Sequence, residues 1–241
     1  MTLIPAIAGL VPPKTVINGE GIYDYGYDSH TETILNFNDF RARQVGWLSV
    51  LSGSYGYTYG SVGLWEWGIC GTSSRPGWAT TYETCDIPSL GLNQPTPRAG
   101  FKSYSEAMAN PRRWGMKFLS DAAVTLKWNE AATTYWEQSR IKNQPAEAHK
   151  QMRLGRTRDL LVAYLPQNSK IVLDLAGTQF SAAPDAWMWL AGRDRYPNQA
   201  QHVSATPVAG YPSRFEFINP WAGFDFRTGY HDTALSIQRA V

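Results

Sequence analysis

The stretch that decides the fold is NFNDFRARQVGWLSVLSGSYGYTYG, residues 36–60. Asn38 can cap a helix whose first turn holds Asp39, where a carboxylate is favourable at the positive end of the helix dipole. The later part of this helix, residues 45–51, is apolar on nearly every side, which favours burial between two layers. Glycines follow the apolar part and offer an end to the helix, and the glycine- and tyrosine-rich run from residue 55 predicts a strand.

A short β-branched run lies before this helix. Residues 15–18, TVIN, predict a buried strand that ends at Gly19, and a polar loop with three alternating tyrosines follows it. Strand, loop, helix and strand make a βαβ unit, which implies parallel strands and an α/β architecture. Another helix is predicted within NPRRWGMKFLSDAAVTL, residues 110–126, with Asn110 as its cap and Pro111 at its first helical position.

The pattern changes from residue 150 onward. KQMRLGRTRDLLVAYLPQNSKIVLDLAG shows short alternating runs separated by turn residues, which is typical of antiparallel strands, and residues 166–169 read as a hairpin-like turn. We therefore expect an α/β domain over residues 1–147 and an all-β sandwich over residues 148–241. The sandwich is rich in aromatic residues that favour a core over a carbohydrate-binding face: Trp187, Trp189, Tyr211, Phe215, Trp221 and Phe224.

Composition excludes several classes of function. The 241 residues carry a net charge of +2 without a run of like charges, which argues against nucleic-acid and membrane partners. No phosphate-binding glycine loop is present, and no apolar run is long enough to span a membrane. Cys70 and Cys85 could form a disulfide or stay reduced, and neither has a neighbouring His or Cys at the spacing of metal ligands, so no metal is expected.

The order of these segments resembles a known family. KTVINGEGIYD, the helix-to-strand run ending in GLWEW, NPRRWGMKFLSDAAVTLKW and LVAYLPQNSKIVLDLAG are similar to the C-terminal part of apiosidase-like glycoside hydrolases of the domain-of-unknown-function 4038 type. The resemblance covers residues 14–241. It implies a (β/α)8 TIM barrel followed by a β-sandwich that bears the name of a collagen-binding domain, an extracellular or periplasmic location, and no cofactor. No signal peptide is visible in the sequence.

The resemblance includes only the last strand-helix units of such a barrel. A complete barrel needs about 250 residues by itself, and roughly half of that precedes the predicted sandwich. Three interpretations follow: the chain is a fragment, another chain supplies the remaining strands, or these residues adopt a reduced α/β arrangement. We favour the first, a partial TIM barrel followed by an antiparallel β-sandwich.

Glu20 is the candidate catalytic nucleophile. It follows a parallel strand, the place where α/β barrels present their chemistry, and it matches the nucleophile of the family. Retaining hydrolysis needs a second carboxyl group about 5 Å away. Glu66 is the candidate acid/base, because the flanking Trp65 and Trp67 could desolvate its carboxyl group and raise its pKa.

Substrate contacts are predicted for several aromatic and polar residues around these two carboxylates: Tyr23, Tyr25, His30, Trp65 and Trp67. Each also has a plain structural interpretation, as a strand edge, a core ring or a surface residue. Arg41 and Arg43, in the predicted helix, are expected to pair with carboxylates or to lie on its exposed side. The predicted function is hydrolysis of glycosidic bonds in plant or microbial polysaccharide, and the alternative is a non-catalytic protein that binds carbohydrate or matrix.

Overall fold

The computed structural model describes the chain in eleven segments: residues 16–19, 27–28, 33–34, 39–60, 113–127, 135–147, 150–157, 159–182, 184–191, 198–221 and 232–239. The chain divides into two compact units. One contains Met1–Gly19, Arg43–Tyr57 and Trp114–Val241, and the other contains Glu20–Ala42 and Thr58–Arg113. In the second unit, two short strands pair antiparallel, β2 (Tyr27–Asp28) and β3 (Thr33–Ile34).

The predicted βαβ unit is present in the described residues. Strand β1 (Ile17–Asn18) pairs in parallel with β4 (Gly56–Tyr57), and the helix between them in sequence is α2 (Asp39–Val50). Gly53 has a φ of 93°, a conformation that glycine adopts at little cost, and it lies just after the helix as predicted. The parallel pairing confirms the order of elements read from the sequence.

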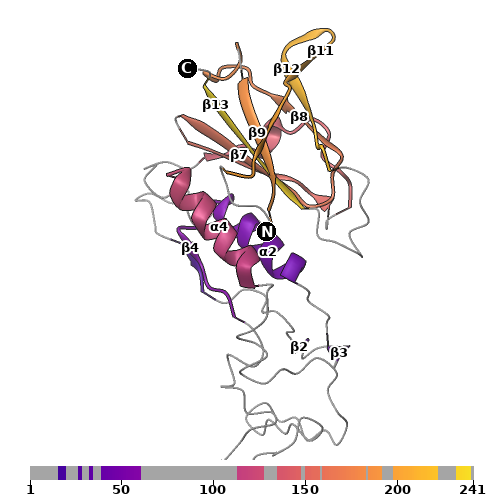
Figure 1. The fold of residues 1–241 in the computed structure, drawn as a ribbon. Coiled ribbons are helices and arrows are strands. Elements are labelled where there is room, and N and C mark those ends of the chain that lie inside the picture. The colour runs from indigo at the N-terminus through magenta and orange to yellow at the C-terminus, as the bar shows by residue number, and fades with distance from the viewer. Residues whose placement is uncertain are drawn as a thin grey trace, which may run out of the picture. The chain divides into compact units, whose positions relative to one another are not determined.

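The second predicted helix is α4 (Arg113–Thr125), which packs against α2. The contact is close because Gly46 of α2 has no side chain. A β-carbon at position 46 would lie 2.8 Å from Met116 Cε and 3.0 Å from Leu119 Cδ2. Figure 1 shows the two helices side by side. Glycine is therefore required here by packing, against its low helix propensity.

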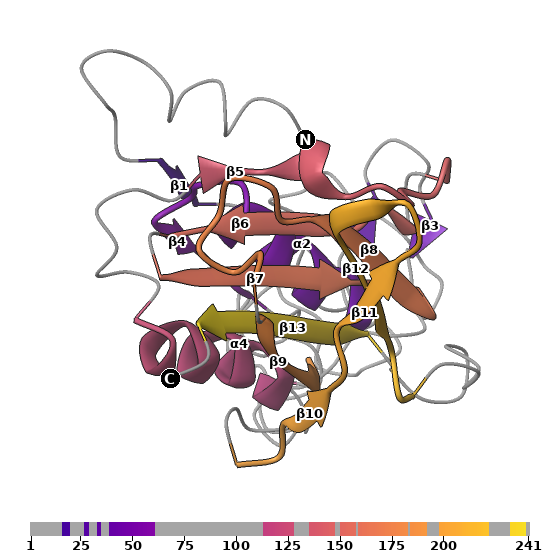
Figure 2. The same cartoon turned by 90° about the horizontal axis from the view of Figure 1, so that it is seen from above.

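The rest of the first unit is built from two antiparallel sheets. The larger sheet has six strands in the order β10-β9-β13-β7-β6-β5, and the smaller has three in the order β11-β12-β8. Figure 2 shows β13, β7, β6 and β5 of the larger sheet beside one another. The bounds are β5 (Tyr135–Trp136), β6 (Arg153–Arg156), β7 (Leu160–Leu165), β8 (Lys170–Asp174), β9 (Pro184–Leu190), β10 (Gln201–Val203), β11 (Thr206–Val208), β12 (Tyr211–Ile218) and β13 (Thr233–Arg239). A 3-10 turn, Gln138–Arg140, follows β5.

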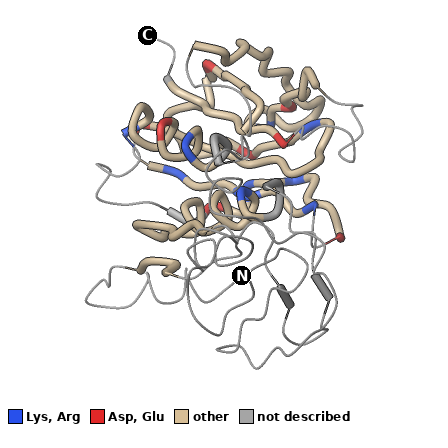
Figure 3. The backbone as a smooth tube through the Cα atoms, turned by 60° about the horizontal axis from the view of Figure 1, so that its bottom comes forward, with Lys and Arg blue, Asp and Glu red and all other residues tan. Residues whose placement is uncertain are grey.

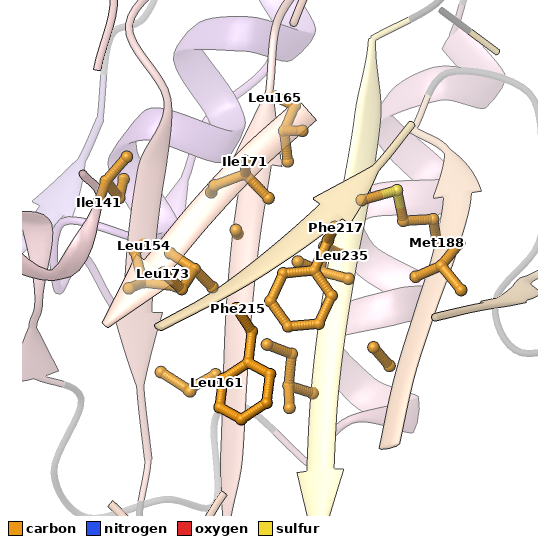
Figure 4. Close-up of a cluster of buried hydrophobic side chains, with 14 of the residues drawn as sticks. Ile141, Leu154, Leu161, Leu165, Ile171, Leu173, Met188, Phe215, Phe217 and Leu235 are labelled. Atoms are coloured by element: carbon orange, nitrogen blue, oxygen red, sulfur yellow. The ribbon is translucent and has the colours of Figure 1, made fainter. Parts of the chain in front are cut away.

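One hydrophobic core lies between the two sheets. Leu161, Leu165 and Leu235 come from the larger sheet, and Phe217 and Leu173 come from the smaller one. All five are fully buried, and Figure 4 shows their side chains converging. Burial of side chains of this size stabilises the fold by about 1.5–3 kcal/mol each.

The turn at residues 166–169 is not a hairpin, and that expectation is wrong. Strand β7 pairs with β6 and β13, whereas β8 pairs with β12 in the other sheet. The turn therefore carries the chain across the core from one sheet to the other. The physical reason is that β7 is buried on both faces. The chain therefore leaves the larger sheet after β7, and β8 joins the smaller sheet, which covers one of these faces.

The other face of the larger sheet packs on the helices. Alternate residues of β7 divide between two cores, and Val162 and Tyr164 join Trp47 of α2 and Leu119 of α4. Every residue of strand β7, whose sequence is LLVAYL, is thus buried. A strand buried on both faces loses the polar-apolar alternation of a half-exposed strand, which accounts for this continuous apolar run.

The aromatic residues of the C-terminal region have mixed positions. Trp189 and Phe215 are buried, and Trp221 packs partly buried against the core between the sheets. Tyr211 is 49% exposed, and Phe224 lies outside the described residues. The division of the chain at residues 147 and 148 stays a prediction, although strand β5 of the larger sheet precedes it.

Candidate active site

The carboxyl ends of β1 and β4 lie side by side. Asn18 and Tyr57 are partners in the parallel register, and they are the last residues of their strands. Parallel α/β folds place their chemistry at this edge, where the loops after the strands meet. Glu20 follows Asn18 by two residues in sequence. Its own position lies outside the described residues, so its catalytic role stays a prediction.

The end of β1 is held to the end of α2 by hydrogen bonds. The Asn18 side-chain amide donates to Ser49 Oγ at 2.8 Å, and the Asn18 backbone N–H donates to Ser54 Oγ at 3.3 Å. Ser49 Oγ in turn donates to the carbonyl of Val45 at 2.8 Å. Tyr55 N–H donates to the carbonyl of Val16 at 2.8 Å. Asn18 is therefore fixed through both its backbone and its side chain.

The serine hydroxyls of α2 and of the turn after it form hydrogen bonds with backbone groups. Ser49, Ser52 and Ser54 are all buried. Ser52 Oγ donates to the carbonyl of Leu48 at 2.5 Å, and Ser54 Oγ lies 2.6 Å from the carbonyl oxygen of Gly56. These contacts give the hydroxyls a structural use.

The remaining predicted site residues lie outside the described residues: Tyr23, Tyr25, His30, Trp65, Glu66 and Trp67. A second carboxyl group about 5 Å from Glu20 would define retaining hydrolysis, and one at roughly 6.5–9.5 Å would define inverting hydrolysis. Cys70 and Cys85 also lie outside the described residues. Each of these assignments stays a prediction.

A buried ion pair joins α2 to the larger sheet, and sequence reasoning missed its acidic member. Arg43 Nε donates to Asp232 Oδ2 at 2.7 Å, and Arg43 Nη2 donates to Asp232 Oδ1 at 2.5 Å. Tyr164 Oη donates to Asp232 Oδ2 at 2.9 Å. The side chains of Arg43 and Asp232 are 1% and 0% exposed. Pairing with a carboxylate was one of two alternatives for Arg43, and it is confirmed; the exposed alternative is wrong.

Tyr164, which contacts this ion pair, belongs to a cluster of buried aromatic rings. The ring of Trp47 stacks on that of Tyr164, with centroids 5.7 Å apart and planes at 11°, and it lies 6.3 Å from the ring of Trp189. These rings exclude water, which strengthens the electrostatic attraction within the pair. The only local signal for Asp232 is a charged residue directly before the apolar strand TALSIQ, and its partner is 189 residues away. Local sequence patterns do not show contacts at that separation.

Other charged groups form structural networks at the periphery. Glu137 accepts hydrogen bonds from Arg140 Nε and, at 2.8 Å, from Arg156 Nε. Burial raises the pKa of the Glu137 carboxyl, but the two arginines outweigh it, so its pKa lies below the ordinary value. A hydrogen bond from Ala176 N–H lowers the pKa of Asp174, and Ser213 and Lys142 assist. Acidic and basic residues are interspersed along the described backbone (Figure 3).

The described segments contain neither a metal-binding cluster nor a membrane-spanning helix. No cluster of three or more His, Cys, Asp or Glu side chains in them is arranged to bind a metal ion. None of their helices combines the length and the apolar character that a membrane crossing requires.

The family follows from comparison with known proteins. Residues 2–130 match the model of the apiosidase-like catalytic domain, which is more than half of the chain. The chain belongs to this apiosidase-like family of glycoside hydrolase-like proteins. A comparison with curated protein sequences gives no match.

Two solved structures are similar in fold. One is described as a glycoside hydrolase and shares 22% sequence identity, with a TM-score of 0.65 over 98% of this chain and 44% of that chain. The other is a glycoside hydrolase family 5 protein from Bacteroides vulgatus ATCC 8482, with 22% identity and a TM-score of 0.64 over 98% and 43%. The chain thus spans less than half the length of either structure.

Proposed function

We propose that this chain provides the nucleophile of a retaining glycoside hydrolase, and that Glu20 is this nucleophile. The observation that carries the proposal is the parallel pair β1–β4. It lies within the residues that match the apiosidase-like catalytic domain, and Glu20 follows its carboxyl edge by two residues. A carboxylate at that edge would attack the anomeric carbon of a sugar and form a covalent glycosyl-enzyme intermediate.

The second carboxyl group of the mechanism is assigned to Glu66. Its acid form would donate a proton to the leaving glycosidic oxygen, and its base form would then activate the water that releases the sugar. Aromatic rings around the two carboxylates would stack on the apolar faces of the sugar, which is the role proposed for Trp65, Trp67, Tyr23 and Tyr25. His30 is proposed as a further polar contact. The substrate class is plant or microbial polysaccharide.

Strands β1 and β4 are proposed to be the last strands of a partial (β/α)8 barrel, and the two antiparallel sheets to be its C-terminal β-sandwich. Parallel sheets occur almost only with both faces covered. In contrast, Ile17 of β1 is 62% exposed and Tyr55 beside β4 is 63% exposed. Both exposures support further barrel strands, in a longer chain or in another one, that would cover this pair.

The test is hydrolysis of a panel of aryl glycosides by the wild-type chain and by Glu20→Gln. The amide keeps the shape of the carboxylate and removes its nucleophilic charge, so kcat should fall by about a thousandfold or more. Glu147→Gln is the matched control, because Glu147 is an exposed carboxylate that pairs with the neighbouring Lys150 at 3.0 Å. Equal rates for wild type and Glu20→Gln would remove Glu20 from the mechanism.

A non-catalytic carbohydrate-binding role is the second candidate, and one surface cluster favours it. Trp187 and His202 are register partners on β9 and β10, with ring centroids 5.4 Å apart. Asp185 accepts a hydrogen bond from Trp187 Nε1 at 3.1 Å and lies 3.3 Å from His202 Nε2. A half-buried indole beside polar groups is a common surface for sugars. Loss of glycan retention in affinity electrophoresis of Trp187→Ala, with hydrolysis absent in wild type, would support this role over catalysis.

A further inference from the structure

We propose that Asp232 is a positioning residue for the candidate active edge. It fixes the orientation of α2, and α2 holds the end of β1 that leads into Glu20. The catalytic meaning of this inference rests on the proposed function. The contacts that transmit it lie within one compact unit of the chain and are independent of any activity.

The first link is a fork of hydrogen bonds. Both carboxylate oxygens of Asp232 accept from Arg43, through Nε and Nη2, and Tyr164 Oη adds a third donor. A bidentate guanidinium-carboxylate pair defines direction as well as distance. Asp232 itself is anchored, because its carbonyl accepts the N–H of Ala191 at 2.8 Å at the end of strand β9. The fork therefore fixes the rotation of α2 against the larger sheet.

The second link is α2 itself. Arg43 and Ser49 are six residues apart, which places them about 120° from each other around the helix. One residue contacts the larger sheet and the other contacts strand β1. A rotation of α2 about its axis would therefore move Ser49 away from Asn18. Gly46 packs closely against Met116 of α4. While Arg43 keeps its position, α2 therefore has little room to rotate about its axis.

The third link is the anchor of the strand end. Ser49 Oγ accepts from the Asn18 side chain at 2.8 Å, and Ser54 Oγ accepts from the Asn18 backbone. Only Gly19 separates Asn18 from Glu20 in sequence. Because only one residue intervenes, the anchored Asn18 fixes the point from which the chain continues to Glu20.

The choice of an ion pair supports a positioning role. A buried ion pair is often no more stabilising than well-packed apolar residues of similar volume, because both charges lose their hydration. Trp47, Tyr164 and Trp189 already provide an apolar contact between α2 and the larger sheet. That apolar contact does not by itself select one rotation of α2 about its axis. The bidentate hydrogen bonds between Arg43 and Asp232 do.

The experiment measures amide hydrogen exchange by NMR in the full chain for wild type and Asp232→Asn. Two amides report the candidate edge, Asn18 N–H and Tyr55 N–H. Two others report the smaller sheet away from α2, Leu175 N–H and Lys142 N–H, which donate to backbone carbonyls at 2.8 and 2.9 Å. We expect exchange at the edge amides to rise about tenfold or more while the reference amides stay within about twofold.

Variants and controls make the result decisive. Arg43→Lys keeps the positive charge and removes the fork. If Asp232→Asn does not fold, exchange at the same four amides is compared between the wild type and Arg43→Lys. Lys117→Ala is the matched control, because it removes an exposed ion pair with Asp121 at 2.7 Å and should change neither pair of amides. The positioning role is overturned if the edge amides are unchanged in a folded variant. It is equally overturned if all four amides accelerate by a common factor, which is the signature of a general loss of stability.

Kinetics give the second readout. On an aryl glycoside that the wild type hydrolyses, the variant should lose kcat by about a hundredfold with little change in KM, because a misplaced nucleophile leaves substrate binding intact. An unchanged kcat together with faster edge exchange would overturn the link to catalysis. A wild type without any hydrolysis would defeat the proposed function, and the exchange data would still decide the positioning of the strand end.

Discussion

The contact between α2 and α4 predicts an unusual effect of a glycine substitution. In an exposed helix, Gly→Ala stabilises by about 1 kcal/mol because alanine has the higher helix propensity. At Gly46 the added β-carbon would lie 2.8 Å from Met116 Cε and 3.0 Å from Leu119 Cδ2. Both distances are shorter than a normal contact of about 3.5–4.0 Å, so neighbouring atoms have to move. Overpacking of this kind costs typically about 1–3 kcal/mol.

The two effects oppose each other, and we expect the steric cost to exceed the propensity gain. Gly46→Ala should lower the free energy of unfolding by about 1 kcal/mol, which corresponds to a fall of about 2–4 °C in Tm for a chain of this length. The assay is urea unfolding followed by circular dichroism. The slope of the transition should stay constant, because the surface exposed on unfolding is unchanged.

A double-mutant cycle with Met116→Ala identifies the cause. Shortening Met116 removes the nearest atom, so Gly46→Ala should be about 1 kcal/mol less costly in that background than in wild type. The reasoning is refuted if Gly46→Ala stabilises the wild type by the full propensity gain. It is also refuted if the effect is the same in both backgrounds, because the helices would then not meet at residue 46.

Three further predictions concern charge and exposure. The folded-state pKa of Glu137 lies below its unfolded value, so its pairing with Arg140 and Arg156 stabilises above the unfolded pKa of about 4.3 and is lost as pH falls through the folded pKa. Glu137→Gln should therefore flatten the dependence of unfolding free energy on pH below about pH 4 in acid titration by circular dichroism, and an unchanged profile would contradict this. Asp232→Ala should lower the unfolding free energy by about 3–5 kcal/mol in urea, because it removes the carboxylate partner of a buried guanidinium; a loss below about 1 kcal/mol would contradict a buried pair. Ile17→Lys should change stability by less than about 0.5 kcal/mol, since Ile17 is 62% exposed, and a larger loss in thermal unfolding would indicate a buried side chain.

The sequence predicted those parts of the fold that depend on local patterns. The β-branched run before Gly19 and the glycines after α2 act within a few residues, and the βαβ order follows from them. The turn at residues 166–169 was misjudged because proline and polar residues favour a turn without specifying which strand the chain joins next. That choice depends on β7 being buried on both faces, which is a tertiary property.

The candidate site could be predicted only in part. The sequence predicted that the ends of β1 and β4 lie side by side, and Asn18 and Tyr57 are partners there; that the site lies at this edge stays a prediction. Asp232 could not be predicted, because its contact with Arg43 joins residues that are 189 positions apart. The roles of Glu20 and Glu66 rest on family and sequence position.

The most direct test of the account is to trap the covalent intermediate. In an activated 2-deoxy-2-fluoro glycoside the fluorine slows both steps of retaining hydrolysis, and the good leaving group restores the rate of the first step only. The sugar therefore accumulates on the nucleophile and can be located by peptide mass spectrometry. The account predicts a single glycosyl adduct on Glu20, which disappears in Glu20→Gln and persists in Glu147→Gln. An adduct on another carboxylate, or hydrolysis of the substrate without any adduct, would contradict it.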